Sequence, residues 1–409
     1  MVPPPFLKKL SAWLAIAAAV SILVSIAASQ ILLALAVAAL LLSGLPLRWP
    51  RIAIPLGLFL LWTLLSLAFS PDPAGGLPQV RKMIVFLTLL TVFSSVRTLR
   101  DIGILTIAWA GVGTYTAILG FSQYVRKLME AAALHRDFYH FYLNQRITGF
   151  QDHWMTFSGQ QMYLLLMLMA FLLFGRVTKK SAWPAALCAV LICMALYLSW
   201  TRMAMIAALA AGLYLLWCWR RWAVAAAPVV LVAAVLVGPP ALRERVNSIV
   251  HPEAGTDSNT FRLIVWRTGW EMIEAHPLLG VGPEQIGNEK VFLSYMPKDI
   301  PRPLPPGFYK HLHSIYIHYA AERGIPATLF LTGALIMALV DFQKALRRLP
   351  PGRSERRFLL HWASAAVIGT MIVGIADVNL GLTDELTMFL VVMCLGYAAA
   401  EGISGNALL

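Results

Sequence analysis

The sequence has few charged residues and no cysteine outside its apolar stretches, and both shortages limit what the protein can be. Charged residues make up 13% of the chain and hydrophobic residues 59%, whereas soluble domains average about 25% charged and 45–50% apolar. This composition excludes an ordinary soluble fold, and it also excludes intrinsic disorder. The four cysteines, at positions 188, 193, 218 and 394, lie within apolar runs, so the polar loops carry no disulfide framework.

Long apolar runs dominate the sequence instead. A helix crosses a bilayer core with about 20 apolar residues, and runs of this kind predict an all-α polytopic membrane protein in which residues 1–409 form one membrane domain. We expect twelve spans, at approximately 12–28, 31–47, 53–69, 83–96, 102–121, 154–175, 182–200, 203–219, 223–240, 324–342, 358–377 and 386–400. The first has features of a signal peptide, but a second follows almost at once, which favours a retained anchor.

The placement of the basic residues predicts the orientation. A net charge of +13 would suggest nucleic acid as the partner of a soluble protein. With a cytoplasmic N-terminus, however, the inner loops hold 17 basic and four acidic residues, and the outer segments hold 16 of each. This is the positive-inside pattern, so we expect no nucleic-acid partner, a location among membrane lipids, and both termini in the cytoplasm.

The same pattern places a long segment, 241–323, in the periplasm. We interpret 311–323 as a short helix at the membrane interface, because a span there would move the basic loop 343–357 to the outside. Structureless loops of such length are uncommon and usually functional. We therefore expect 241–323 to contain short helices that carry part of an active site. A shorter outer segment is expected at 122–153.

Several kinds of chemistry have no counterpart in the sequence. No charged residue falls at a span centre, which disfavours an ion or proton pump but leaves a carrier of neutral substrates open. There is no Asp-x-Asp pair, no Gly-x-Ser-x-Gly elbow and no glycine-rich nucleotide loop. On a helix, His311 and His313 would point about 200° apart, and His311 and His318 would lie about 10.5 Å apart along the axis. We expect no metal site and no cofactor.

Arg202 lies in the short outer turn Ser199-Trp200-Thr201-Arg202. A basic residue in such a turn opposes the insertion bias, and the turn is short enough to keep Arg202 at the membrane surface. Thr201 or Ser199 can cap the next helix, whose N-terminus also favours an anion. Arg202 therefore suits a bound phosphate, and a contact with a lipid headgroup is the alternative.

Arg262 belongs to a segment that we expect to be an amphipathic helix ending at Ala275. Gly280 and Gly282 follow and permit a tight turn that can approach a ligand closely. Arg262 is either a phosphate ligand or the partner of Asp257 or Glu271 in a surface ion pair. Arg267 is expected to be a structural or solvated partner.

Three further basic residues open outer helices or spans. Arg146 lies just before the sixth span, and Arg81 and Lys82 lie at the start of the fourth. Each is a candidate for binding a diphosphate. Each is also placed where a headgroup anchor is common.

His313 ends the long outer segment, followed by Ser314. A histidine on a helix is usually a satisfied polar residue, but one beside arginines at the outer surface suits proton removal from a hydroxyl. Guanidinium groups hold a diphosphate through planar, bidentate hydrogen bonds without a metal. The combination predicts group transfer from a lipid diphosphate at the outer leaflet.

The chain at this point resembles the O-antigen ligase and polymerase superfamily of bacterial inner membranes. Four stretches carry the resemblance, in the family's order: 146–149, 199–202, 262–282 and 313–324. The resemblance implies a fold similar to the membrane glycosyltransferases of the GT-C class, a glycan donor on undecaprenyl diphosphate and a lipid A–core acceptor. The resemblance also implies that Arg202, Arg262 and His313 are essential residues. Arg146 matches the family less closely. The family often has Asn directly after the histidine, whereas this sequence has Ser314 there. The resemblance places Ser314 on the acceptor side of the site.

The resulting prediction is an O-antigen ligase of lipopolysaccharide biosynthesis, metal-independent and inverting. Arg202 and Arg262 bind the diphosphate, with Arg146, Arg81 and Lys82 as further donor-binding candidates, and His313 positions or deprotonates the acceptor hydroxyl. An O-antigen polymerase, a glycoprotein O-oligosaccharyltransferase and, from another class, a lipid-linked glycan transporter remain alternatives.

Overall fold

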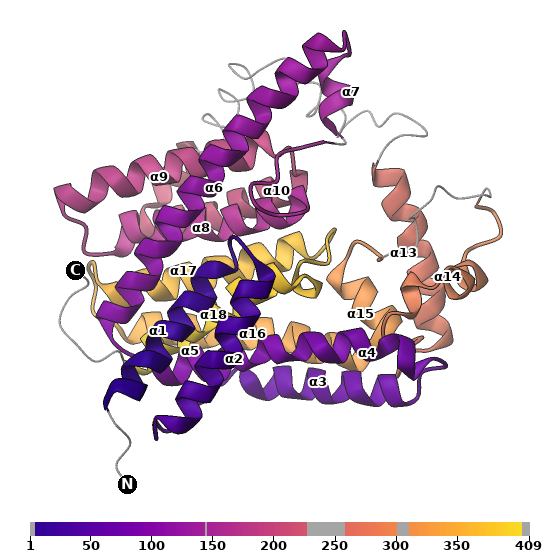
Figure 1. The fold of residues 1–409 in the computed structure, drawn as a ribbon, viewed down its shortest axis with the longest axis horizontal. Helices are drawn as coiled ribbons and strands as arrows, with labels where there is room; N and C mark the ends of the chain where they lie inside the picture. The colour runs from indigo at the N-terminus through magenta and orange to yellow at the C-terminus, as the bar shows by residue number, and fades with distance from the viewer. Residues whose placement is uncertain (1–4, 144, 227–257, 301–310, 403–409) are drawn as a thin grey trace.

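The computed structural model describes residues 5–143, 145–226, 258–300 and 311–402, and every regular element in these ranges is a helix (Figure 1). The all-α prediction is thereby confirmed. The α-helices are α1 (Pro5–Ser21), α2 (Ile26–Leu42), α3 (Ala53–Ala68), α4 (Pro73–Lys82), α5 (Leu87–Ser95), α6 (Leu99–Ala133), α7 (Phe138–Leu143), α8 (Trp154–Phe174), α9 (Lys179–Leu198), α10 (Arg202–Trp219), α13 (Ser258–Ala275), α14 (Glu289–Tyr295), α15 (Ile315–Arg323), α16 (Ile325–Arg348), α17 (Glu355–Val373) and α18 (Thr383–Glu401). Three 3₁₀ turns are η1 (Met83–Phe86), η2 (Gln285–Gly287) and η3 (Asn379–Gly381).

Within the described ranges, seven helices are long and apolar enough to cross a membrane. They are Pro73–Ser95, which joins α4, η1 and α5, together with α6, α8, α9, α10, α16 and α18. The shorter helices α2 and α3 are also apolar. The chain is thus a polytopic membrane protein, while twelve spans stay a prediction, since most of the expected ninth span, 223–240, lies outside the described residues.

The first two expected spans are misplaced. A turn at 22–25 separates α1 from α2, inside the predicted range 12–28. The first three residues of the turn are apolar, and Ile22 and Leu23 are fully buried, so hydropathy does not reveal it. Its polar signal is Ser25, whose side chain accepts a hydrogen bond from the amide of Ala28 and caps α2.

Two helices extend beyond their predicted ranges. α6 runs for 35 residues, from Leu99 to Ala133, so the outer segment predicted to begin at 122 begins as a continuation of the span expected at 102–121. The span expected at 83–96 is preceded by α4, which Asp72 caps and which Pro73 starts. This placement leaves Lys82 at the end of α4, facing the outer loop.

The core of the bundle lies between α8, α17 and α18. Trp109 of α6 meets Trp362 of α17 edge to face at 5.9 Å, and both indoles are fully buried. Each indole N–H donates to a backbone carbonyl, at Ala19 and Tyr163 respectively. The hydrogen bonds satisfy the polar edge of these rings, as burial requires.

Ion pairs connect residues that the charge pattern assigns to the inner side. Arg48 and Arg97 both contact Glu401, at 2.8 and 3.3 Å. Arg51 contacts Asp341 at 2.9 Å, and Arg176 contacts Glu355 at 3.6 Å. Three of the four acids predicted for that side therefore lie beside bases predicted for the same side. In Figure 1, α13, α14 and α15 lie at the opposite end of the bundle.

The described part of the long outer loop is folded around its own apolar cluster. Val265, Met272, Phe292 and Leu312 are buried there with residues of α15. α13 ends at Ala275, as predicted, and residues 276–287 then turn back toward the bundle. The expected short helix at 311–323 is shorter than predicted and spans Ile315–Arg323.

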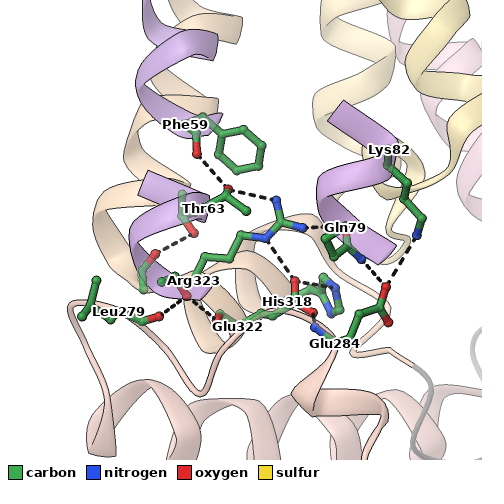
Figure 2. A network of polar contacts seen from close by, with 12 residues as sticks. Phe59, Thr63, Gln79, Lys82, Leu279, Glu284, His318, Glu322 and Arg323 are labelled. Atoms are coloured by element: carbon green, nitrogen blue, oxygen red, sulfur yellow. Dashed lines mark hydrogen bonds and ion pairs between the residues drawn. The ribbon is translucent and has the colours of Figure 1, made fainter. Parts of the chain in front are cut away.

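A buried ion pair fixes this loop to the bundle (Figure 2). The Arg323 guanidinium donates to Glu322 at 3.1 Å, to Thr63 of α3 at 3.3 Å and to Gln79 of α4 at 3.0 Å. The other oxygen of the Glu322 carboxylate accepts the backbone N–H of Glu284 at 2.7 Å. Arg323 is 5% exposed and Glu322 1%. One pair therefore joins α3, α4, α15 and the loop before η2.

We predict opposite sides for two exposed loop residues, Lys298 and Arg353. In a background without the four native cysteines, an impermeant maleimide should label Lys298→Cys in intact spheroplasts and Arg353→Cys only in inside-out vesicles, because the basic residues favour the cytoplasm. Labelling of both variants in spheroplasts would contradict the predicted orientation.

We also predict that Arg323→Leu destabilises the protein strongly. Removing one partner leaves the Glu322 carboxylate buried and unpaired, which costs about 3–5 kcal/mol. The matched control is Arg267→Leu, since Arg267 forms a bidentate pair with Asp299 at 2.9 and 3.0 Å on the exposed surface. Thermal unfolding in detergent should be lowered by the first change and nearly unaffected by the second. Equal shifts would mean that the buried pair has no special role.

Candidate active site

The turn that precedes Arg202 is built on an aromatic cluster. Trp200 is buried and has a left-handed backbone, with φ of 50°, a conformation that is uncommon for residues other than glycine. Its ring packs on Tyr142 at 4.7 Å and on Tyr139 at 5.6 Å. Thr201 occupies the cap position of α10, as predicted, but its hydroxyl donates back to Ser199. Arg202 is the first residue of α10.

Arg146 lies against the same turn. Its guanidinium donates to the carbonyl of Trp200 at 3.3 Å and stacks over the ring of Trp154 at 4.6 Å. The pKa of neighbouring His153 is lowered, first by burial and then by the positive charge of Arg146. Arg146 thus connects the turn before Arg202 to the start of α8, and its guanidinium lies close to His153.

His313 lies at a bend in the loop before α15, not on a helix. Its φ is 48°, and its ring lies 4.1 Å from that of His311 and 5.3 Å from Phe261. The prediction that the His311 and His313 side chains point apart is therefore wrong, because it assumed that both residues lie on a helix. Ser314 donates its hydroxyl to the carbonyl of Gly374 at 3.3 Å, which ties this loop to the end of α17.

The electrostatic environment of His313 identifies its neighbours. Its pKa is lowered to about 3, mainly by burial and further by His311, Arg262 and His153. The pKa of Asp377 is raised to about 7 by burial, against the opposing effect of Arg262. Arg262, His313 and Asp377 therefore lie within electrostatic reach of one another, and the imidazole of His313 is neutral at physiological pH.

Gly280 and Gly282 approach the protein's own backbone. Both have positive φ, and a Cβ on Gly280 would clash with the peptide bond between Glu322 and Arg323. The amides of Val281 and Gly282 donate to the carbonyls of Ala321 and Glu322, each at 2.9 Å. These glycines let the loop pack against the end of α15, and an approach to a ligand stays a prediction.

A cavity of about 300 Å³ opens beside these residues. Five segments contribute to its wall: α4, the start of α8, the loop around Glu284, residues 311–323 and the loop 377–382. Its polar lining residues are Gln79, Lys82, His153, Thr156, Glu284, His311, His318, Tyr319, Glu322, Arg323 and Asp377. The lining includes His311, which adjoins His313, so the cavity lies next to the candidate proton acceptor.

The structure brings some predicted residues together and separates others. Arg262 lies near His313, Arg146 lies near His153, and Lys82 lines the cavity 3.8 Å from Glu284. Arg81 is exposed and is not among the lining residues of the described cavity. Sequence reasoning did not identify Thr156, Tyr319, Glu284 or Asp377 as site residues. Only proximity in the fold unites them, since they come from four separate segments.

Comparison with known proteins agrees with the motifs. Residues 187–332 match the family model described as O-antigen ligase, and no curated protein gave a match. The matched segment contains Arg202, Arg262 and His313, and it leaves out Arg146, Arg81 and Lys82. The family includes ligases and polymerases that act on lipid-linked glycans, and the match does not separate the two. The chain is therefore similar to the O-antigen ligase family over residues 187–332.

Proposed function

We propose that this protein is an O-antigen ligase, which transfers a glycan from undecaprenyl diphosphate to lipid A–core at the periplasmic face of the inner membrane. The observation that carries the proposal is the neutral, partly buried imidazole of His313 beside Arg262, both within the family match. A neutral imidazole can accept a proton, and a nearby guanidinium can hold a phosphate. A GT-C type fold and a catalytic role for the outer loop 241–323 are part of the proposal.

The proposed reaction is a single displacement. The acceptor hydroxyl oxygen attacks the anomeric carbon, the bond from that carbon to the diphosphate breaks, and undecaprenyl diphosphate leaves with the bonding electrons. His313 takes the hydroxyl proton, and Arg202 and Arg262 stabilise the charge that develops on the leaving diphosphate. A single displacement inverts the anomeric centre. The mechanism assigns no step to a metal.

Donor binding makes His313 a better base. In the free protein, burial and neighbouring positive charge lower its pKa to about 3. A bound diphosphate brings negative charge to the same place, and an opposite charge favours the protonated form. The pKa of His313 is thus expected to rise when the donor binds. Proton transfer is then favoured in the complex that is ready to react.

Arg146 and Lys82 are proposed to support the donor site. Arg146 holds the carbonyl of Trp200 and the ring of Trp154, so it supports the turn that presents Arg202. Lys82 pairs with Glu284 at the cavity wall. Arg81, exposed at the end of α4, remains a candidate contact for the donor or for a lipid headgroup.

Two alternative functions remain, an O-antigen polymerase and a lipid-linked glycan transporter. A polymerase would use the same donor and extend the glycan on its lipid carrier. A lipid-linked glycan transporter would need the arginines but no proton acceptor. Reconstitution into proteoliposomes with purified donor and lipid A–core separates them by product: glycan on lipid A–core for a ligase, longer carrier-linked glycan for a polymerase, and no new glycosidic bond for a transporter.

We predict that Arg202→Lys and Arg262→Lys keep the charge but lose most transfer. Lysine offers a point charge in place of two parallel hydrogen bonds, and a preorganised donor at developing charge contributes about 10²–10³ in rate. Arg267→Lys, on the same helix as Arg262 but paired with Asp299, should stay near wild type. Initial rates of transfer provide the comparison. Wild-type rates in the first two variants would reduce these arginines to headgroup anchors.

We predict that His313→Asn lowers turnover by roughly 10²–10⁴ and leaves donor binding intact. Asparagine tolerates the left-handed backbone at this position better than most residues, so the change tests the imidazole and not the backbone. Donor affinity and single-turnover transfer are measured on the same preparation. Unimpaired turnover would exclude His313 as the proton acceptor.

A further inference from the structure

The cavity beside His313 contains polar groups that the fold leaves without partners. The hydroxyls of Thr156 and Tyr319 line it and form no hydrogen bond within the described part of the chain, although these residues are only 6% and 3% exposed. His318 is 7% exposed, its Nδ1 has no hydrogen-bond partner there, and its Nε2 lies 3.6 Å from Glu322, beyond hydrogen-bond range. Buried polar groups are usually paired, so the buried, unpaired Nδ1 of His318, together with two partnerless hydroxyls that line the same cavity, indicates a ligand.

The charges of the described lining residues do not favour an anion, because two basic residues, Lys82 and Arg323, stand among three acidic ones. Arg323 is paired with Glu322 at 3.1 Å, and Lys82 lies 3.8 Å from Glu284. The remaining charged group, Asp377, is acidic. A phosphate site needs an excess of positive charge and hydrogen-bond donors, which this lining lacks. The cavity is therefore better suited to an uncharged polar group.

The size and chemistry of the cavity limit the class of ligand that it can bind. Its volume of about 300 Å³ is at the lower end of the roughly 300–1,000 Å³ typical of small-molecule sites. Thr156 and Tyr319 can each donate or accept, and the carboxylates and imidazoles can accept. A sugar ring carries several hydroxyls that are both donors and acceptors, and it matches this set.

We propose that the cavity binds one uncharged sugar ring of the substrate through Thr156, His318 and Tyr319. The inference rests on the proposed function, because the cavity adjoins His313 and so lies where a sugar beside the reacting hydroxyl or the anomeric carbon would be. The ring belongs either to the acceptor or to the first residue of the donor glycan. Arg323 and Glu322 form part of the wall, and their charges offset each other.

Removal of single hydroxyls tests the proposal in the transfer assay. Thr156→Val and Tyr319→Phe retain size, and the phenyl ring retains the stacking on Arg323. Each should raise one KM roughly two- to tenfold with little change in kcat, because a neutral hydrogen bond made equally in ground and transition states is lost. A rise in the KM of lipid A–core assigns the ring to the acceptor, and a rise in the KM of the donor assigns it to the donor glycan.

A matched control comes from the same helix. Tyr316→Phe removes a hydroxyl that donates to the carbonyl of Met371 at 3.0 Å, and Tyr316 does not line the cavity. This control loses a hydrogen bond of the fold, so its stability should fall at least as much as that of Tyr319→Phe, while its KM values stay near wild type. Similar KM changes in both tyrosine variants would overturn the proposal.

Direct binding separates this inference from the proposed function. Lipid-free core oligosaccharide and delipidated repeat-unit oligosaccharide are each offered to the full-length protein in detergent, and contact is detected by saturation-transfer NMR. Binding of one of them that weakens roughly tenfold or more in the Thr156→Val, Tyr319→Phe double variant supports the sugar site even if no transfer is detected. Equal binding to wild type and double variant would refute the site, even if the protein proves to be a ligase.

Discussion

The buried contact between Arg323 and Glu322 is the constraint on which the outer end of this protein depends. It lies where α15 ends and α16 begins, and it connects α3, α4 and the loop before η2. Gly324 completes the junction with φ of 88°, and a Cβ there would clash with the carbonyl of Leu278. The position of the loop that ends in His313 therefore follows from one charged pair and the backbone packed around it.

That pair also determines the chemical character of the cavity. Because the Arg323 guanidinium is paired with the Glu322 carboxylate at 3.1 Å, it adds no unbalanced charge to the cavity wall. The proposed site thus combines two kinds of group: Arg262, near His313, for a diphosphate, and the cavity beside His313 for a neutral sugar.

The sequence predicted the helical class and the end of α13 at Ala275. It also predicted that Arg48, Arg51 and Arg97 lie on the same side of the membrane as the acids they contact. These features follow from the hydropathy and charge of neighbouring residues, which can be seen in the sequence alone. It did not predict the turn at 22–25, because apolar residues form that turn, nor the length of α6. It misjudged His311 and His313 because helical spacing does not apply before α15. Thr156 and Tyr319 carry no local signal at all, and they become neighbours only because the fold brings α8, α15 and the loop 377–382 to one cavity.

The most direct test of the central claim, that the chain is a ligase, is the lipopolysaccharide profile of a strain from which it is deleted. Loss of a ligase stops transfer after the polymer has been made, so the account predicts lipid A–core without O-antigen and an accumulation of polymer on undecaprenyl diphosphate. A profile in which lipid A–core is instead capped by single repeat units would contradict the account, because it would mean that the missing activity is polymerisation.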